Sequence, residues 1–333
     1  MNLNSNIETL VAFGKELKKG SSVLQELLHK TEIENGWFTQ KNMQLSIDVF
    51  CENYFHEEKL SRWLSKYDIH ENSNKTVGLI LAGNIPFVGM HDLLCVLMSG
   101  NNAKVKLSSK DKYFFPYMME RLEKLNKDYA NKVEFVEKLE KFDAVIATGS
   151  NNSARYFNYY FGKYPHIIRK NRTSTAILSG NETDEQLHGL GKDVFWYYGL
   201  GCRNVSKIYV PEAFDLQRLF KVWEDYRDVI DNNKYKNNFD YNRAILLLNQ
   251  TPHLTNDFFM LVESDKIFSP LSLLYYEFYS SKSELEEKIN AIHDDLQCVV
   301  ASTEGNTPFG KTQFPELTDY ADHVDTMEFL QKL

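Results

Sequence analysis

The chain has 333 residues, of which 25% are charged and 43% hydrophobic, ordinary values for a globular protein with room for two domains. Acidic residues outnumber basic ones by 46 to 38, and the net charge of -8 argues against general affinity for nucleic acid or anionic membranes. The four cysteines, at positions 51, 95, 202 and 298, form no CxxC pair, so neither a disulfide framework nor a zinc site is indicated.

The N-terminus lacks the charged start, apolar centre and small-residue cleavage site of a signal peptide. The most apolar run, TVGLILAGNIPFVGM, is interrupted by Asn84 and Pro86 and is too short to span a bilayer. We therefore expect a reduced, cytoplasmic protein without stable membrane insertion.

Apolar periodicity predicts helices over residues 7–66, where apolar side chains recur every three to four positions. Strands and helices then alternate up to residue 161, which predicts a doubly wound α/β sheet. The predicted strands are 75–83, 102–107, 133–136 and 142–149, and the predicted helices between them are 88–98 and 113–127.

A second α/β segment follows residue 179, and the sequence shows neither an internal repeat nor a Pro/Ser/Gly linker. A helix over 184–198, capped by Asp184, is predicted to lead into a turn at Cys202. The later predicted elements are strands 206–210, 244–248 and 272–279 and helices 214–228 and 283–293. We therefore expect an N-terminal helical region (1–74), a dinucleotide-binding domain (75–178), a catalytic domain (179–310) and a C-terminal tail (311–333).

Cys202 differs from the other cysteines because it lies in a turn directly after Gly201. A cysteine nucleophile needs access, thiolate character and donors for an oxyanion. The C-terminal end of the preceding helix disfavours a thiolate, so backbone N–H groups after the turn or Arg203 are the candidates that activate it. The alternative is a buried structural cysteine, and the other three cysteines, in apolar context, are assigned to packing.

Five short stretches resemble, in order, motifs of the aldehyde dehydrogenase superfamily. They are AGNIPF, SGNNAKVKLSSK, DAVIATGSNNSARYF, GLGCRNVSKIYVPEAFD and SDKIFSPLSLLYYEFYSS. Within that superfamily, the short chain, the sequence around Cys202 and the ending LTDYADHVDTMEFL look most like the fatty acyl-CoA reductases of the LuxC type. The resemblance implies an aldehyde-dehydrogenase-like α/β fold, with a Rossmann-like cofactor domain and an α/β catalytic domain.

The resemblance also implies catalytic roles. Cys202 matches the catalytic cysteine, which attacks an acyl thioester. Asn84 matches the asparagine whose amide, with the cysteine backbone N–H, holds the oxyanion, and the alternative for Asn84 is a turn residue before Pro86.

One departure from the family pattern concerns hydrolysis. Arg169 or Lys170 stands where hydrolysing dehydrogenases carry a general-base glutamate, so attack of water on the thioester should be slow. Arg169 and Arg172 are equally compatible with contacts to CoA phosphates and with a solvated basic turn.

A second departure concerns the nicotinamide cofactor. Lys106 matches a lysine that contacts the adenosine ribose, and Ser109 stands where NAD-preferring members carry a glutamate. A serine does not repel a 2′-phosphate, which Lys106 and Lys110 can neutralise, so NADPH is expected rather than NADH. The alternative is that these lysines form only an exposed face.

Thr148, Gly149 and Ser150 match a cofactor-binding TGS turn at a helix N-terminus. A third departure is in DKIFSP, where Lys266 occupies the place of the family's glutamate that holds the nicotinamide ribose. Asp265 beside it is the candidate that substitutes for this glutamate.

The sequence thus predicts an NADPH-dependent reductase that converts an acyl-CoA or acyl-carrier thioester, of a fatty acid, to an aldehyde. A cysteine-dependent acyltransferase with a degenerate nucleotide site is the alternative, and a non-catalytic scaffold is a third hypothesis. The family usually associates, so a homo-oligomer is expected, and no histidine falls into a metal-binding pattern.

Overall fold

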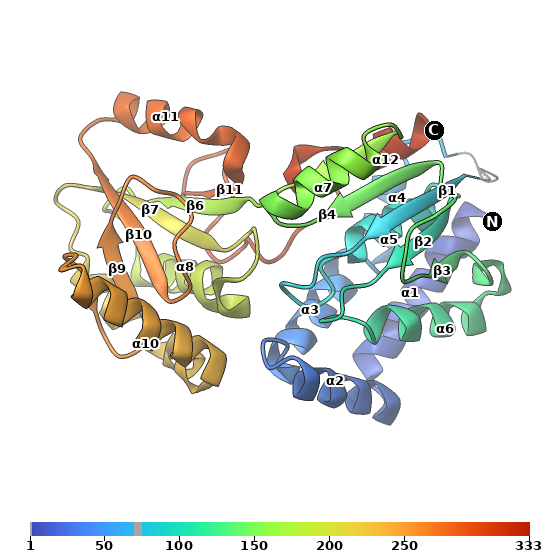
Figure 1. Ribbon diagram of the computed structural model, residues 1–333, viewed down its shortest axis with the longest axis horizontal. Helices are drawn as coiled ribbons and strands as arrows, with labels where there is room; N and C mark the ends of the chain where they lie inside the picture. The colour runs from blue at the N-terminus through green and yellow to red at the C-terminus, as the bar shows by residue number, and fades with distance from the viewer. Residues whose placement is uncertain (1, 70–74) are drawn as a thin grey trace. The chain divides into compact units, whose positions relative to one another are not determined.

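The computed structural model describes residues 2–69 and 75–333, which form two compact units (Figure 1). Unit 1 contains the residues up to Asn171 together with Pro315–Leu333, and unit 2 contains Arg172–Phe314. Each unit is built around a β-sheet of its own.

Four helices open unit 1, and their apolar faces pack into its core. They are α1 (Leu3–Lys19), α2 (Ser22–Glu34), α3 (Gln40–Asn53) and α4 (Glu57–Leu64). Side chains of Asn2, Ser21 and Thr39 cap the first three helices by accepting from backbone N–H groups of the first turn. Leu10 and Phe13 are fully buried, as their spacing predicts, and the helices expected over 7–66 are confirmed.

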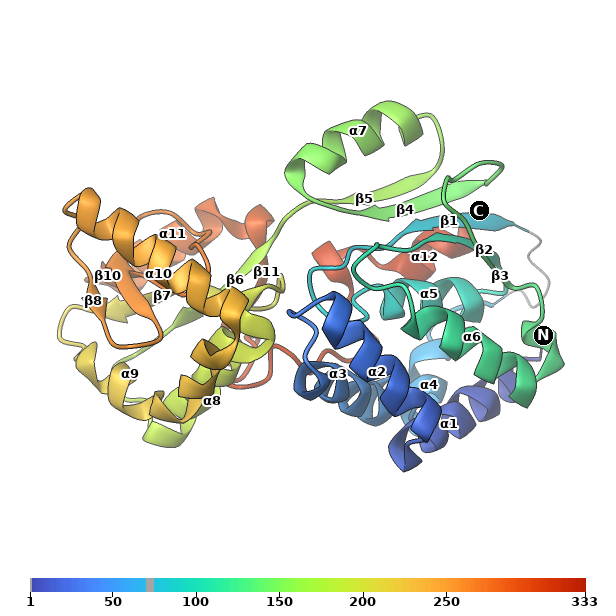
Figure 2. The same cartoon turned by 60° about the horizontal axis from the view of Figure 1, so that its bottom comes forward.

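The sheet of unit 1 is parallel and has the strand order β3-β2-β1-β4-β5. Its strands are β1 (Thr76–Ile80), β2 (Asn102–Lys106), β3 (Val133–Phe135), β4 (Ala144–Thr148) and β5 (His166–Arg169). The crossovers contain α5 (Met90–Met98), α6 (Phe114–Leu125), η1 (Lys127–Tyr129) and α7 (Asn151–Phe161). Figure 2 shows α7 on one face of this sheet and α5 on the other, so the predicted doubly wound sheet is confirmed.

The C-terminal segment belongs to unit 1 and ends in η5 (Ala321–His323) and α12 (Thr326–Gln331). Arg169, at the end of β5, ties this segment to the sheet. Its guanidinium forms an ion pair with Asp92 of α5 and donates to Thr326 Oγ1 at 2.9 Å. Arg169 is only 3% exposed, so sheet, helix and C-terminal segment share one enclosed polar contact.

The sheet of unit 2 has the strand order β11-β6-β7-β10-β9-β8, and β8 pairs antiparallel with β9. The strands are β6 (Thr173–Ile177), β7 (Val205–Pro211), β8 (Leu254–Thr255), β9 (Met260–Glu263), β10 (Leu273–Tyr279) and β11 (Leu296–Val300). The helical segments are α8 (Asp184–Phe195), η2 (Trp196–Gly199), α9 (Gln217–Val222), η3 (Glu224–Asp231), α10 (Asn233–Leu248), α11 (Lys282–Ala291) and η4 (His293–Asp295).

The strand expected over 244–248, AILLL, is wrong, because these residues complete α10. Asn232 caps a helix that then runs without interruption to Leu248. Leu246 is buried on the side that holds Phe239, whereas Leu248 is 78% exposed. A run of five apolar residues fits a strand or a helix equally well, and the helical start upstream decides between them.

The helix expected over 184–198 is shorter than predicted and is capped by a different residue. Thr183, and not Asp184, accepts from the N–H of Gln186, whose side chain accepts from the Thr183 N–H in return. This reciprocal pair is a capping box. The α-helical backbone ends at Phe195, and Tyr197 and Tyr198 that follow are left-handed.

Within residues 2–69 and 75–333, none of the helices combines the length and apolar character needed to cross a membrane. In the same part of the chain, no three His, Cys, Asp or Glu side chains are grouped so as to hold a metal ion.

We expect Arg169→Ala to lower the free energy of unfolding by about 3–5 kcal/mol, because it leaves the Asp92 carboxylate buried without its cation. Lys170→Ala removes a neighbouring but exposed cation and should change stability little. Urea unfolding of the full chain measures both. Equal stabilities of the two variants would show that the buried pair does not anchor the C-terminal segment.

Candidate active site

The candidate cofactor and oxyanion residues of unit 1 follow the carboxyl ends of three neighbouring strands. Asn84 lies in the loop after β1, Lys106 ends β2 and Ser109 lies in the loop after it, and Thr148 ends β4. Ile80 pairs in register with Lys106 on one side and with Ala147 on the other. Parallel strands end at the same edge, so the fold brings these residues to one edge of the sheet, where doubly wound proteins bind ligands.

Side chains at this edge are accessible. Asn84, Lys106, Ser109 and Ser150 are exposed, and Gly149 is half-buried. Ser150 caps α7 by accepting from the Ser153 N–H at 3.2 Å, as its place at the helix start predicts.

The loops after β1 and β2 are in close contact. A Cβ atom on Gly83 would lie 2.3 Å from Ser108 Oγ, so only glycine allows this approach. Neither Lys106 nor Lys110 has a carboxylate partner among the described residues, and both ammonium groups face solvent. Exposed, unpaired cations at the carboxyl end of β2, beside β1, suit the phosphates of a dinucleotide.

In unit 2, Cys202 lies in a turn between α8 and β7. The backbone is left-handed at Tyr197, Tyr198 and Gly199, with φ values of 53°, 58° and 77°. Cys202 is half-buried, whereas the other three cysteines are buried, as the sequence predicted for them. The turn therefore leaves Cys202 partly exposed.

Asn204 holds this turn. Its Oδ1 accepts from the Gly201 N–H at 2.8 Å, and its Nδ2 donates to the carbonyl oxygens of Asp193 at 3.0 Å and Trp196 at 2.8 Å. Asn204 is 2% exposed, and its own N–H donates to the Gly201 carbonyl. One buried amide thus binds the last turn of α8 to the backbone beside Cys202.

Ser174 of β6 holds the turn from the other side. Its Oγ donates to the Cys202 carbonyl at 3.0 Å and accepts from the Cys298 N–H of β11 at 3.1 Å. Arg203, a candidate activator of the cysteine, donates to Cys298 Sγ at 3.4 Å. The Cys202 backbone is therefore fixed to β6, and the neighbouring Arg203 contacts β11.

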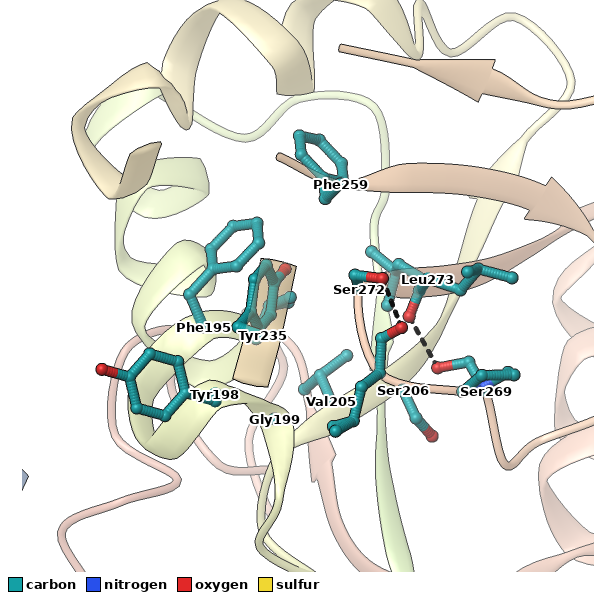
Figure 3. A pocket seen from close by; sticks show the side chains of 14 residues that line it. Phe195, Tyr198, Gly199, Val205, Ser206, Tyr235, Phe259, Ser269, Ser272 and Leu273 are labelled. Carbon is teal, nitrogen blue, oxygen red and sulfur yellow. Dashed lines mark hydrogen bonds between the residues drawn. The ribbon is translucent and has the colours of Figure 1, made fainter. Parts of the chain in front are cut away.

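A small cavity lies behind the turn, and Figure 3 shows aromatic rings along one side and serine side chains along the other. Its volume is about 40 Å³, room for one or two water molecules. A long acyl chain does not fit this cavity unless side chains move. Its labelled polar and aromatic lining consists of Phe195, Tyr198, Tyr235, Phe259, Ser206, Ser269 and Ser272.

Asp265 is exposed, on the loop between β9 and β10. Two residues of β7 hold this loop by its backbone: Lys207 Nζ donates to the Asp265 carbonyl at 3.0 Å, and Ser206 Oγ donates to the Ile267 carbonyl. Lys207 is 1% exposed and also forms an ion pair with Glu277 of β10.

The two arginines weighed as phosphate contacts lie in different units. Arg169 is enclosed in unit 1, where its two terminal guanidinium nitrogens bind Asp92 and Thr326. Arg172, half-buried in unit 2, donates to the Leu296 carbonyl at 2.8 Å. The enclosure of Arg169 argues against the contact with CoA phosphates that the sequence allowed.

Sequence reasoning missed the residues that support the site, namely Ser174, Asn204 and Lys207. A polar residue two positions after the candidate cysteine was a usable signal for Asn204, because Asn commonly bonds to nearby backbone in turns. Ser174 and Lys207 lie on strands, and nothing in the local sequence indicates their distant partners.

The fold is that of the aldehyde dehydrogenases. Aldehyde dehydrogenase 21 from Physcomitrella patens, in complex with the product succinate, matches with a TM-score of 0.64 and 13% identity, covering 91% of this chain and 74% of that one. Glyceraldehyde-3-phosphate dehydrogenase from Methanocaldococcus jannaschii, complexed with NADP, gives 0.65 and 14%, covering 91% and 77%. A Mycobacterium tuberculosis aldehyde dehydrogenase with NAD⁺ gives 0.64 and 13%, covering 91% and 74%.

The acyl-CoA reductase (LuxC) family model matches residues 37–219, more than half of the chain, including the Asn84 loop and the Cys202 turn. This chain therefore belongs to the LuxC acyl-CoA reductase family, and the resemblance, the fold class and the acyl-CoA reductase activity expected from the sequence are confirmed. A search among curated proteins gave no match.

We expect Asn204→Ala to lower the free energy of unfolding by about 1–3 kcal/mol, because the Gly201 N–H and two carbonyl groups lose a buried partner. Reductase kcat/KM should fall more than about tenfold, because the turn that carries Cys202 is no longer fixed. Asn238→Ala removes an amide that bonds only within α10, to the Lys234 carbonyl, and is the matched control. Equal effects of the two variants on activity would contradict the role of Asn204.

Proposed function

We propose that this acyl-CoA reductase works through a thioester on Cys202 and reduces it to an aldehyde with NADPH. The observation that carries the proposal is the family match across the Cys202 turn. Accessibility supports it, because Cys202 is the half-buried member of the four cysteines. Burial raises the pKa of Cys51 to about 11 and that of Cys95 well above the usual thiol range, so both stay protonated and unreactive.

The first step transfers the acyl group to the enzyme. The Cys202 thiolate adds to the thioester carbonyl, the carbon–sulfur bond to CoA breaks, and CoA leaves as a thiolate that takes a proton from solvent. In the proposal, the Asn84 amide and the Cys202 backbone N–H hold the developing oxyanion, and one such donor contributes about 3 kcal/mol to lowering the barrier. The exposed Asn84 side chain and the fixed Cys202 backbone support these roles.

The second step needs hydride, which NADPH supplies to the acyl carbon when bound. We assign its 2′-phosphate to Lys106 and Lys110. Ser109 carries no negative charge that would repel this phosphate. The TGS turn, residues 148–150, is assigned to the pyrophosphate, and Asp265 to the nicotinamide ribose. The carbonyl then re-forms, the bond to Cys202 sulfur breaks, and aldehyde leaves.

The residues at the end of β5 favour reduction of the thioester over its hydrolysis, because neither can act as a general base. Arg169 is enclosed in its ion pair with Asp92, and the neighbouring Lys170 is an exposed cation. Neither serves as a general base toward water, so the thioester persists until hydride arrives. The family match also favours the reductase over a cysteine-dependent acyltransferase.

The substrate is proposed to be a fatty acyl group on CoA or on a carrier protein. We also propose that the protein is cytoplasmic and forms a homo-oligomer.

Incubation with acyl-CoA in the absence of cofactor should add the mass of the acyl group to the protein, and Cys202→Ala should abolish both the adduct and NADPH oxidation. Cys51→Ala removes a buried thiol, whose Sγ contacts the Gly14 carbonyl at 3.4 Å, and should keep both. Intact-mass spectrometry and absorbance at the cofactor's wavelength are the measurements. An adduct that still forms in the Cys202→Ala variant would show that another residue is the nucleophile.

Ser109→Glu should weaken NADPH binding by about tenfold or more, because its carboxylate repels the 2′-phosphate, and should leave NADH binding intact or stronger. Lys104→Ala, on the preceding strand β2, is the control, since that ammonium already pairs with Glu134 at 3.4 Å. Fluorescence titration with both reduced cofactors compares the variants. A wild-type preference for NADH would refute the assignment of the phosphate to this edge.

A further inference from the structure

A buried acidic residue, Asp111, lies beside the Asn84 loop and takes no part in the proposed reaction. Asp111, in the segment between β2 and α6, is 1% exposed. Its Oδ2 accepts from the Phe87 N–H at 2.7 Å, and its Oδ1 has no hydrogen-bond partner among the described residues. A buried carboxyl with one protein contact is costly, so its presence calls for a physical reason.

Asp111 accepts this hydrogen bond from Phe87, a residue of the Asn84 loop with an unusual backbone conformation. Phe87 has a φ of 57°, a left-handed conformation that costs a bulky residue about 1–2 kcal/mol. Its ring is fully buried and stacks on Phe114 of α6, with ring centroids 4.0 Å apart. The Phe87 carbonyl accepts from the Met90 N–H, which starts α5.

The segment that carries Asp111 is itself held in place. Asn35, after α2, donates to the Lys110 carbonyl at 3.3 Å, and Glu34 pairs with Lys112 at 2.8 Å. The Asp111 N–H donates to the Ser108 carbonyl at 3.0 Å. The carboxyl of Asp111 is thus a fixed acceptor for the Phe87 N–H, and not an adaptable surface group.

We propose that Asp111 is a positioning residue, which holds Phe87 in its left-handed conformation and thereby fixes the loop that carries Asn84, three residues earlier. Its effect on catalysis rests on the proposed role of Asn84 in the acylation step. Burial raises the pKa of Asp111 to about 7, against the influence of the Phe87 N–H, as expected for a carboxyl with a single polar contact.

The first test measures loop order and needs no activity. We expect Asp111→Ala to speed amide hydrogen exchange of the peptide spanning residues 81–89 by about tenfold. The reason is that the Phe87 N–H loses its hydrogen bond to a buried acceptor. Asp111→Asn keeps an oxygen acceptor and should stay within about threefold of the wild type. Asp111→Leu, of similar size and without an acceptor, replaces the alanine variant if that one does not fold. Unchanged exchange in the variants without an acceptor overturns the proposal.

The second test measures CoA release in a single turnover without cofactor. Asp111→Ala should slow it about tenfold in the wild-type background and less than twofold in an Asn84→Ala background, because both changes act through the same amide. Tyr129→Phe, which removes a buried hydroxyl of unit 1 that has no partner among the described residues, is the packing control and should leave the rate unchanged. Equal slowing in both backgrounds overturns the link to Asn84.

The two tests separate this inference from the proposed function. A wild-type chain that releases no CoA refutes acylation of Cys202, and the exchange measurement then still decides whether Asp111 fixes the loop.

Discussion

The buried amide of Asn204 is the interaction on which the candidate catalytic turn depends. After α8 the chain passes through left-handed Tyr197 and Tyr198, each at a cost of about 1–3 kcal/mol. Asn204 offsets this cost by bonding at once to the end of α8 and to the Gly201 N–H. Ser174 then fixes the Cys202 carbonyl to β6. Cys202 is thus partly exposed on a backbone that these hydrogen bonds fix.

In unit 1, a buried polar side chain holds the Asn84 loop in the way that Asn204 holds the Cys202 turn. The Asn84 loop also contains a left-handed residue, Phe87, and a buried polar side chain, Asp111, again bonds to the backbone beside it. Both residues proposed to handle the acyl group therefore stand on turns whose unfavourable backbone is held by a buried polar group. Such turns combine exposure of one side chain with little freedom of the backbone, which preorganised donors require.

The edge of the unit 1 sheet that is proposed to bind the cofactor is locally positive, whereas the whole chain carries a net negative charge. The net charge is -8, yet Lys106 and Lys110 are exposed without acidic partners among the described residues at the ends of parallel strands. A local pair of cations lets an acidic protein bind an anionic cofactor without attracting nucleic acid generally.

Much of the architecture could be predicted from the sequence, and the failures have physical causes. The strands β1, β2 and β4 are bounded by turns and follow one another with helices between, so their pattern is local. The error at 244–248 arose because a short apolar run carries no period of its own. The strands β5 and β9 have only four residues each, and β6, TSTAI, contains three hydroxyl side chains, so none of them stands out in the sequence. Cys202 and Asn84 could be proposed from motif order. Ser174, Lys207 and Asp111 could not, because their function depends on partners that only the folded chain brings near.

The central claim is that the Cys202 thioester waits for hydride and not for water. The most direct measurement is a chase of the preformed acyl-enzyme, with CoA removed, followed by product analysis with and without NADPH. The account predicts that the adduct persists alone and is released as aldehyde, in one equivalent, when NADPH is added. Release as free acid at the same rate without cofactor would contradict it.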